Sequence, residues 1–159
     1  MSNVATAPSL ILYVMKIKLL LILLTISSTA LWADFEIRDA SHSPVEGYTT
    51  SSYTAGGKER KVYLGPDILV SSKDIEDAFT SKLADTYSVH IEFTDEGAQK
   101  LKKITEKRIR KEVAIIIDAE VLSAPTIMAT LSKSVQITGL SKSKAEDLTK
   151  KILNHNQSE

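Results

Sequence analysis

The stretch VAIIIDAEVLS at residues 113–123 decides which fold this sequence adopts. Residues 113–117 are all apolar and mostly β-branched, a pattern typical of a central strand and too short for a usual helix. A polar joint at 118–120 separates this run from a second apolar run at 121–127, so the pattern predicts a β-hairpin. Pro125 has no N–H to donate to a neighbouring strand, which indicates that the second strand is an edge strand or ends there.

On the N-terminal side of this hairpin, residues 89–93 alternate apolar and polar side chains and predict a strand with one buried face. Thr94 follows and is a suitable N-cap, because its hydroxyl accepts a free backbone N–H of the first helical turn. Ala98, Leu101 and Ile104 then recur at helical spacing, with lysines around them. The sequence therefore predicts a strand followed directly by an amphipathic helix.

On the C-terminal side, residues 134–138 predict a short strand that ends at Gly139. Ser141 is the predicted N-cap of a last helix, which runs toward the C-terminus. The apolar stripe of this helix consists of Ala145, Leu148, Ile152 and Leu153.

The segments upstream of residue 89 carry weaker patterns. Residues 34–39 alternate and predict a short strand, whereas the Ser-, Thr- and Gly-rich residues 40–59 indicate a flexible linker or a long loop. A brief strand at 61–64, which Gly65-Pro66 ends, and a short helix at 73–80 complete the order. Strands and helices in this order predict an α+β fold, in which two to three helices pack on a mainly antiparallel sheet.

The composition excludes several classes of function. The 159-residue chain contains 20 basic and 20 acidic residues and no cysteine. Residues 1–33 contain two lysines and no acidic residue, so the remainder is slightly acidic, which argues against a nucleic-acid-binding protein. Without cysteine there is no disulfide, thiolate nucleophile or Cys-ligated zinc.

The N-terminus has the pattern of a signal peptide. Lys16 and Lys18 precede an apolar run at 19–26 and a small polar run at 27–30. We expect cleavage between Ala33 and Asp34, with cleavage after Ala30 as the alternative. The competing interpretation is an uncleaved anchor lengthened by residues 10–15, and either Met1 or Met15 is the true start. The expected organisation is a signal peptide with an upstream extension at 1–33, a strand and flexible segment at 34–59, an α+β domain at 60–155 and a disordered tail at 156–159.

No group of residues predicts catalysis or a cofactor. His42, His90 and His155 lack metal-ligand spacing, so we interpret them as solvated surface side chains. Asp118 fits a tight turn better than an active site, and Ser123 lacks a nucleophile motif. We therefore expect a protein that is not an enzyme and holds no metal or cofactor.

A basic run extends along the helix that Thr94 caps and beyond its end. One interpretation is a helix face in contact with solvent, which needs no partner. The alternative is a surface that contacts anionic lipid or an acidic polypeptide. Its members are Lys100, Lys102, Lys103, Lys107, Arg108, Arg110 and Lys111.

Residues 89–153 resemble the head subdomain of the large periplasmic domain of SecD, the accessory subunit of the bacterial protein-export translocase. The stretches that carry the resemblance are HIEFTDEGA at 90–98, Ile104-Thr105 of the following helix, VAIIIDAEVLSAP at 113–125, QITGLS at 136–141 and KAEDL at 144–148. Residues 62–65 and 74–78 also fit the segment that precedes the head. One departure is Asp118-Ala119, where the family usually has Asp-Gly. Alanine disfavours the positive φ of a type I′ turn, which leaves the turn type open.

The resemblance implies a module on the outer side of the inner membrane that holds polypeptide. This sequence has no counterpart of the family's transmembrane helices with ionisable residues, so we expect a standalone binding module. Its expected partners are unfolded or extended polypeptide, translocase subunits or another envelope protein, with membrane contact only through an uncleaved N-terminus. The expected location is the periplasm. The expected peptide-binding edge consists of Leu122, Ser123, Ala124, Pro125, Thr126 and Ile127.

Overall fold

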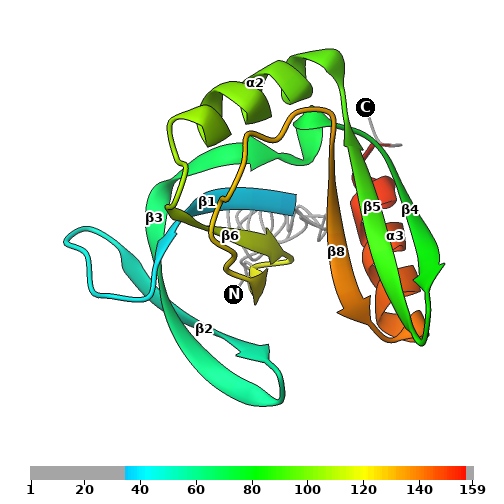
Figure 1. Cartoon of the computed structure of the whole chain (residues 1–159), viewed down its shortest axis with the longest axis horizontal. Helices are drawn as coiled ribbons and strands as arrows, with labels where there is room; N and C mark the ends of the chain where they lie inside the picture. The colour runs from blue at the N-terminus through cyan, green and yellow to red at the C-terminus, as the bar shows by residue number, and fades with distance from the viewer. Residues whose placement is uncertain (1–34, 157–159) are drawn as a thin grey trace, which may run out of the picture. The chain divides into compact units, whose positions relative to one another are not determined.

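The structure is a computed structural model that describes residues 35–156, with side chains described to Asn154. Two antiparallel sheets and two α-helices make up this part of the chain (Figure 1). The predicted α+β class, with helices packed on mainly antiparallel sheet, is confirmed. The signal-peptide and cleavage predictions at Ala30, Ala33 and Asp34 fall outside the described residues.

The larger sheet has five strands in the order β2-β3-β1-β6-β7. Their bounds are β1 Phe35–Ser41, β2 Thr49–Ala55, β3 Lys58–Ser71, β6 Glu112–Ile117 and β7 Glu120–Ser123. β1 lies in the middle and pairs with β3 on one side and β6 on the other, with Phe35 opposite Ile117. The first strand of the described residues is therefore central to the sheet.

The smaller sheet has three strands in the order β4-β5-β8, with α3 packed against it (Figure 1). Its elements are β4 Ile75–Leu83, β5 Thr86–Phe93, β8 Ser134–Leu140 and α3 Lys142–Asn156. A short 3₁₀ helix, η1 Ser72–Asp74, leads from β3 into β4, and α2 Asp95–Glu106 follows β5. Leu148 and Ile152 of α3 and Leu101 of α2 enter one core with Phe35.

The predicted helix after Thr94 and the predicted hairpin at 113–123 are both present in the structure. Thr94 caps α2 as expected, because its hydroxyl accepts a hydrogen bond of 3.0 Å from the Gly97 N–H. β6 and β7 form the predicted hairpin, and Asp118 and Ala119 both adopt positive φ, at 54° and 62°. These angles belong to a type I′ turn, so the turn forms although Ala119 replaces the usual glycine.

The predicted helix at 73–80 is wrong, because these residues form η1 and then β4. A register shift between Ile75 and Asp77 places an extra residue in β4 opposite β5. This bulge puts Ile75 and Ala78 on the same buried side although they are three residues apart. A spacing of three is also the spacing of a helix face, which explains the wrong prediction.

The segment at 40–59 also differs from the expected flexible loop. It contains β2, which pairs along its whole length with β3 through a turn at Gly56 and Gly57, with φ of 60° and 74°. β3 does not stop at Gly65-Pro66 as expected but continues to Ser71, with an irregular register in that region. Pro66 is tolerated within the strand because the irregularity there leaves its missing N–H without a ladder position to fill.

Candidate functional site

Among the described strands, β7 and β8 each have one edge without a partner strand, and the two strands lie near each other. β7 pairs with β6 and no other described strand, and β8 pairs with β5 alone in the same part of the chain. Both strands line one hollow of about 840 Å³, to which the end of β2 also contributes. We call this hollow the strand-edge groove and define it by Ser52–Gly56, Glu120–Ser123 and Gln136–Leu140.

The floor of the strand-edge groove is apolar and its rim is polar. Ile115, Leu122 and Ile137 line it, and Ile137 is almost fully buried. Glu120 and Lys144 stand at the rim with 3.8 Å between the Lys144 ammonium and the Glu120 carboxylate. An apolar floor beside free backbone edges suits an extended polypeptide, because the backbone bonds to the edges while alternate side chains pack on the floor.

A second hollow of about 380 Å³ continues from the strand-edge groove toward α2. The two hollows share Ile115, Pro125 and Gln136. Leu101 and Ile104 of α2 line the second hollow, which is mainly apolar. A chain that leaves the groove past Pro125 would therefore meet further apolar surface.

The residues of the predicted peptide-binding edge do not all line the strand-edge groove. Leu122, Ser123 and Pro125 line the strand-edge groove, whereas Ala124 is buried against the core on the other side of β6. Residues 125–127 already have backbone partners. The Val113 N–H donates to the Pro125 carbonyl (3.0 Å), Thr126 pairs with Glu112, and the Ile127 N–H donates to the Lys111 carbonyl (2.9 Å).

Sequence reasoning missed the contribution of β8 to this site. β8 begins seven positions after the end of the predicted edge, and no local motif connects the two segments. Gly139, which adopts φ of 77° in β8, is the available signal, because glycine inside a strand often marks a bulge or a close backbone approach.

His42 and His90 contact other side chains and are not simply solvated as the sequence had suggested. His42 places Nδ1 2.6 Å from a Glu112 carboxylate oxygen and Nε2 3.0 Å from the Tyr53 hydroxyl. His90 stacks on Phe79 and places Nε2 2.8 Å from the Ser81 hydroxyl. The side chain of His155 lies outside the described residues.

The described residues form no cluster that could hold a metal ion. No group of three or more His, Cys, Asp or Glu side chains comes together among them. Asp118 forms an ion pair of 2.7 Å with Lys151, and the hydrogen bond from Lys151 to Asp118 raises the pKa of the lysine. Between residues 35 and 156, neither helix has both the length and the apolar composition needed to cross a bilayer.

The basic run separates into paired and unpaired cations. Lys100 donates to Asp74 at 2.8 Å, and Arg108 donates to both carboxylate oxygens of Asp39, at 2.6 and 2.9 Å. The hydrogen bond to Asp39 raises the pKa of Arg108. The remaining cations of the run are exposed. They are Lys102, Lys103, Lys107, Arg110 and Lys111.

Comparison with known proteins identifies relatives of this domain. The family described as "SecDF, P1 head subdomain" matches residues 48–154. The chain is 44% identical over 52 residues to the protein translocase subunit SecD of Aquifex aeolicus, which covers 33% of this chain and 10% of that protein. It is 32% identical over 79 residues to the SecD of Elusimicrobium minutum, which covers 48% of this chain and 17% of that protein. The chain thus spans less than a fifth of the length of these relatives.

Solved structures share the fold. A structure of SecDF, a membrane component that enhances protein export, matches with a TM-score of 0.61 and 22% identity, over 93% of this chain and 70% of that chain. The crystal structure of SecDF in its super-membrane-facing form matches with a TM-score of 0.59 and 24% identity, over 76% of this chain and 18% of that chain.

Proposed function

The chain belongs to the SecDF P1 head subdomain family, and from this premise we propose that it serves protein export by holding an extended segment of polypeptide in the strand-edge groove. The observation that carries the proposal is that β7 and β8 both present an unpaired edge to one groove. An extended segment between them forms backbone hydrogen bonds with one or both strands.

This mode of binding suits a ligand of variable sequence. Backbone hydrogen bonds to a strand edge do not depend on the side chains of the ligand, and Ile115, Leu122 and Ile137 offer apolar contact without a deep pocket of fixed shape. A protein that accepts many exported chains needs this low selectivity. The proposal includes no chemical step.

The proposed location is the outer side of the inner membrane. The signal-like pattern of residues 16–30 and the family of periplasmic head domains support it. Mass spectrometry of the protein recovered from the periplasmic fraction tests it. A mature N-terminus at Asp34 or Leu31 is the expected result, and an uncleaved chain in the membrane fraction would support the anchor instead.

Cysteine crosslinking tests the groove directly, because the chain contains no cysteine of its own. A single cysteine at Leu122 or Thr138, both in the groove, is oxidised together with an unfolded secretory protein that carries one cysteine. We expect crosslinks at both positions. The control is Asp85→Cys in the β4–β5 turn, outside the groove. Crosslinking at Asp85→Cys as strong as in the groove would overturn the proposal.

A groove-filling variant gives an independent measurement. Thr138 is exposed in β8 and lines the groove, so Thr138→Trp places a bulky ring there without disturbing the core. We expect the affinity for an unfolded polypeptide to fall at least about tenfold while the melting temperature stays unchanged. Thr86→Trp, at an exposed position beside the β4–β5 turn, is the matched control. Loss of binding to one envelope protein alone would instead favour a dedicated interaction module.

A further inference from the structure

The turn after α2 and the loop after β7 form one surface that the proposed function does not use. We call this surface the basic tip and define it by residues 107–111 and 127–131. Two backbone hydrogen bonds hold its segments together, from the Arg110 N–H to the Ile127 carbonyl (2.7 Å) and from the Ile127 N–H to the Lys111 carbonyl (2.9 Å). The Leu131 N–H donates to the buried Thr105 hydroxyl (3.0 Å), so the loop is fastened on both sides of Met128.

The basic tip exposes large apolar side chains. Met128 is 77% exposed, Ile109 41% and Leu131 37%. Met128 and Leu131 border the second hollow, yet both remain exposed while the backbone on either side of Met128 is hydrogen-bonded. Exposed apolar side chains that gather in one place mark a contact surface.

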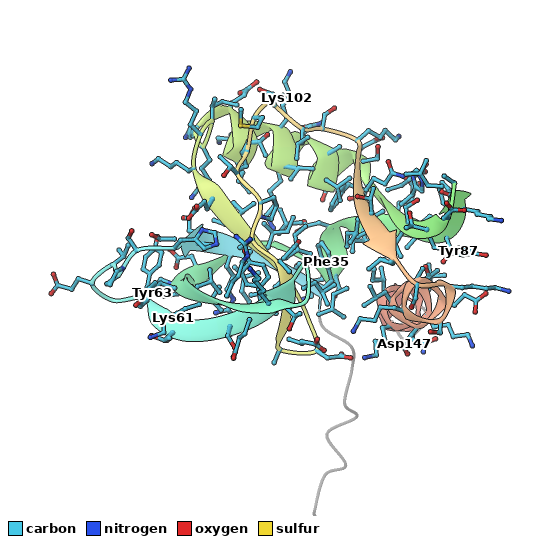
Figure 2. All side chains as sticks on the ribbon, turned by 60° about the horizontal axis from the view of Figure 1, so that its bottom comes forward. Phe35, Lys61, Tyr63, Tyr87, Lys102 and Asp147 are labelled. Atoms are coloured by element: carbon cyan, nitrogen blue, oxygen red, sulfur yellow. The ribbon has the colours of Figure 1, made fainter. Side chains whose placement is uncertain are left out.

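Cations without a carboxylate partner surround these apolar side chains. Lys107, Arg110 and Lys111 belong to the tip, and Lys102 and Lys103 lie on the preceding turn of α2. No ion pair occurs at these five residues within the described part of the chain, in contrast to Lys100 and Arg108. Figure 2 shows Lys102 projecting from the outer side of α2. Glu106 is the single acidic residue between positions 102 and 111.

Arg110 occupies a strained backbone position. Its φ is 65°, in the left-handed region that glycine adopts more easily than other residues. An arginine there costs stability relative to glycine, so the position supplies a charge at the expense of the fold.

We propose that the basic tip binds the surface of an anionic lipid bilayer. Met128, Ile109 and Leu131 enter the headgroup region, while the surrounding lysines and Arg110 lie against the lipid phosphates. Apolar side chains rimmed by Lys and Arg are the composition that interfacial binding requires. An acidic polypeptide matches the charge but offers no apolar medium for a side chain as exposed as Met128.

A fluorescent label on the tip tests the proposal in the full chain. The chain has no cysteine, so Met128→Cys takes a single environment-sensitive dye. Such a label reports on the tip itself, whatever the N-terminal segment does. We expect a blue shift with vesicles that contain phosphatidylglycerol, reversed by high salt, and none with phosphatidylcholine alone. The dye at Asp85→Cys, in the β4–β5 turn away from α2 in Figure 1, should not shift.

Matched charge variants provide the control. Each basic residue near an anionic surface contributes about fivefold to binding, so Lys107→Gln, Arg110→Gln and Lys111→Gln together should weaken binding about 100-fold. The same neutralisation at Lys58, Arg60 and Lys61, three exposed cations of the β2–β3 hairpin, should leave the blue shift unchanged. In Figure 2, Lys61 lies far from Lys102.

A single substitution separates binding from folding. Arg110→Gly relieves the positive φ and should raise the melting temperature while it weakens vesicle binding about fivefold. The proposal is overturned by an equal shift on neutral vesicles, by an equal loss in the hairpin control, or by a shift with polyglutamate but not with anionic vesicles.

Discussion

The two sheets differ in how many of their faces are covered. In the five-stranded sheet, β6 is buried on both faces, because Ile117 enters the main core and Ile116 enters a second cluster with Val62. In the three-stranded sheet, β5 buries Ile91 on one face, whereas His90 lies on the other face beside the exposed Phe79. The all-apolar run of β6 and the alternating run of β5 already encode this difference. Side chains on the outer face of the three-stranded sheet should therefore contribute less to stability than those buried in the shared core.

Two phenylalanines, one in each sheet, give the largest expected contrast. Phe35 of β1 is fully buried, so Phe35→Ala should lower the free energy of unfolding by about 3–5 kcal/mol. Phe79 of β4 is 42% exposed and stacks on His90, with 4.8 Å between ring centroids, so Phe79→Ala should cost under about 1.5 kcal/mol. Urea denaturation of both variants measures the two values. Equal losses would contradict the contrast between the sheets.

Alanine-to-glycine changes in one turn of each sheet should have the same effect on stability. The difference between the sheets would then lie in side-chain burial alone. Ala119 in the β6–β7 turn and Ala84 in the β4–β5 turn both adopt positive φ, at 62° and 51°. Glycine relieves this strain at a cost in unfolded-state entropy, so each alanine-to-glycine change should stabilise the protein by about 0.5–1 kcal/mol. Thermal denaturation provides the measurement. As a control, Ala98→Gly within α2 should destabilise, because α2 contains no such strain at that position. Stabilisation in only one turn would show that the sheets differ in more than coverage.

The smallest expected effect concerns an ion pair that links the two sheets. Lys151 of α3, which packs on the three-stranded sheet, donates to Asp118 in the β6–β7 turn at 2.7 Å. The pair is about a third exposed, so solvent screening limits its contribution to under about 1 kcal/mol.

The pH dependence of this pair has a defined direction. The hydrogen bond to Asp118 raises the pKa of Lys151 above its usual value of about 10.4, so the pair stabilises fully below that pH and is lost as the pH rises through the raised pKa. Asp118→Asn preserves a residue that tolerates positive φ and removes the charge. Urea midpoints of the protein and the variant should differ at neutral pH and converge in strong alkali. A constant difference across this range would show that the turn, not the charge, matters.

The sequence predicted the elements in which local pattern and tertiary environment agree. The buried run of β6, the alternation of β5 and the Thr94 cap of α2 each have a pattern that only one kind of element satisfies. The β4 prediction failed because a bulge changes a strand period of two into a spacing of three. β2 was missed because its Ser- and Thr-rich sequence resembles a loop, although Thr and Tyr favour strands and Gly56-Gly57 favours a hairpin turn.

Of the two strand edges at the candidate site, the sequence predicted one and missed the other. The β7 edge follows from the hairpin and Pro125, since both are local features of the sequence. The β8 edge depends on which strand of the smaller sheet comes to lie beside the groove, and that is decided by packing between segments far apart in the chain. Site predictions from a single sequence therefore find one wall of a groove more readily than the opposite one.

The central position of β1 also determines when the domain becomes complete. Phe35 pairs with Ile117, so the middle of the larger sheet waits for a partner that emerges more than eighty residues later. Because contacts of such sequence separation form slowly, a growing or threading chain lacks the β1–β6 pairing until most of the domain is available. The β2–β3 hairpin forms from neighbouring residues and has no such delay. Completion of the larger sheet is thus a late step. A chain interrupted before residue 112 lacks β6, the second partner of the central strand β1.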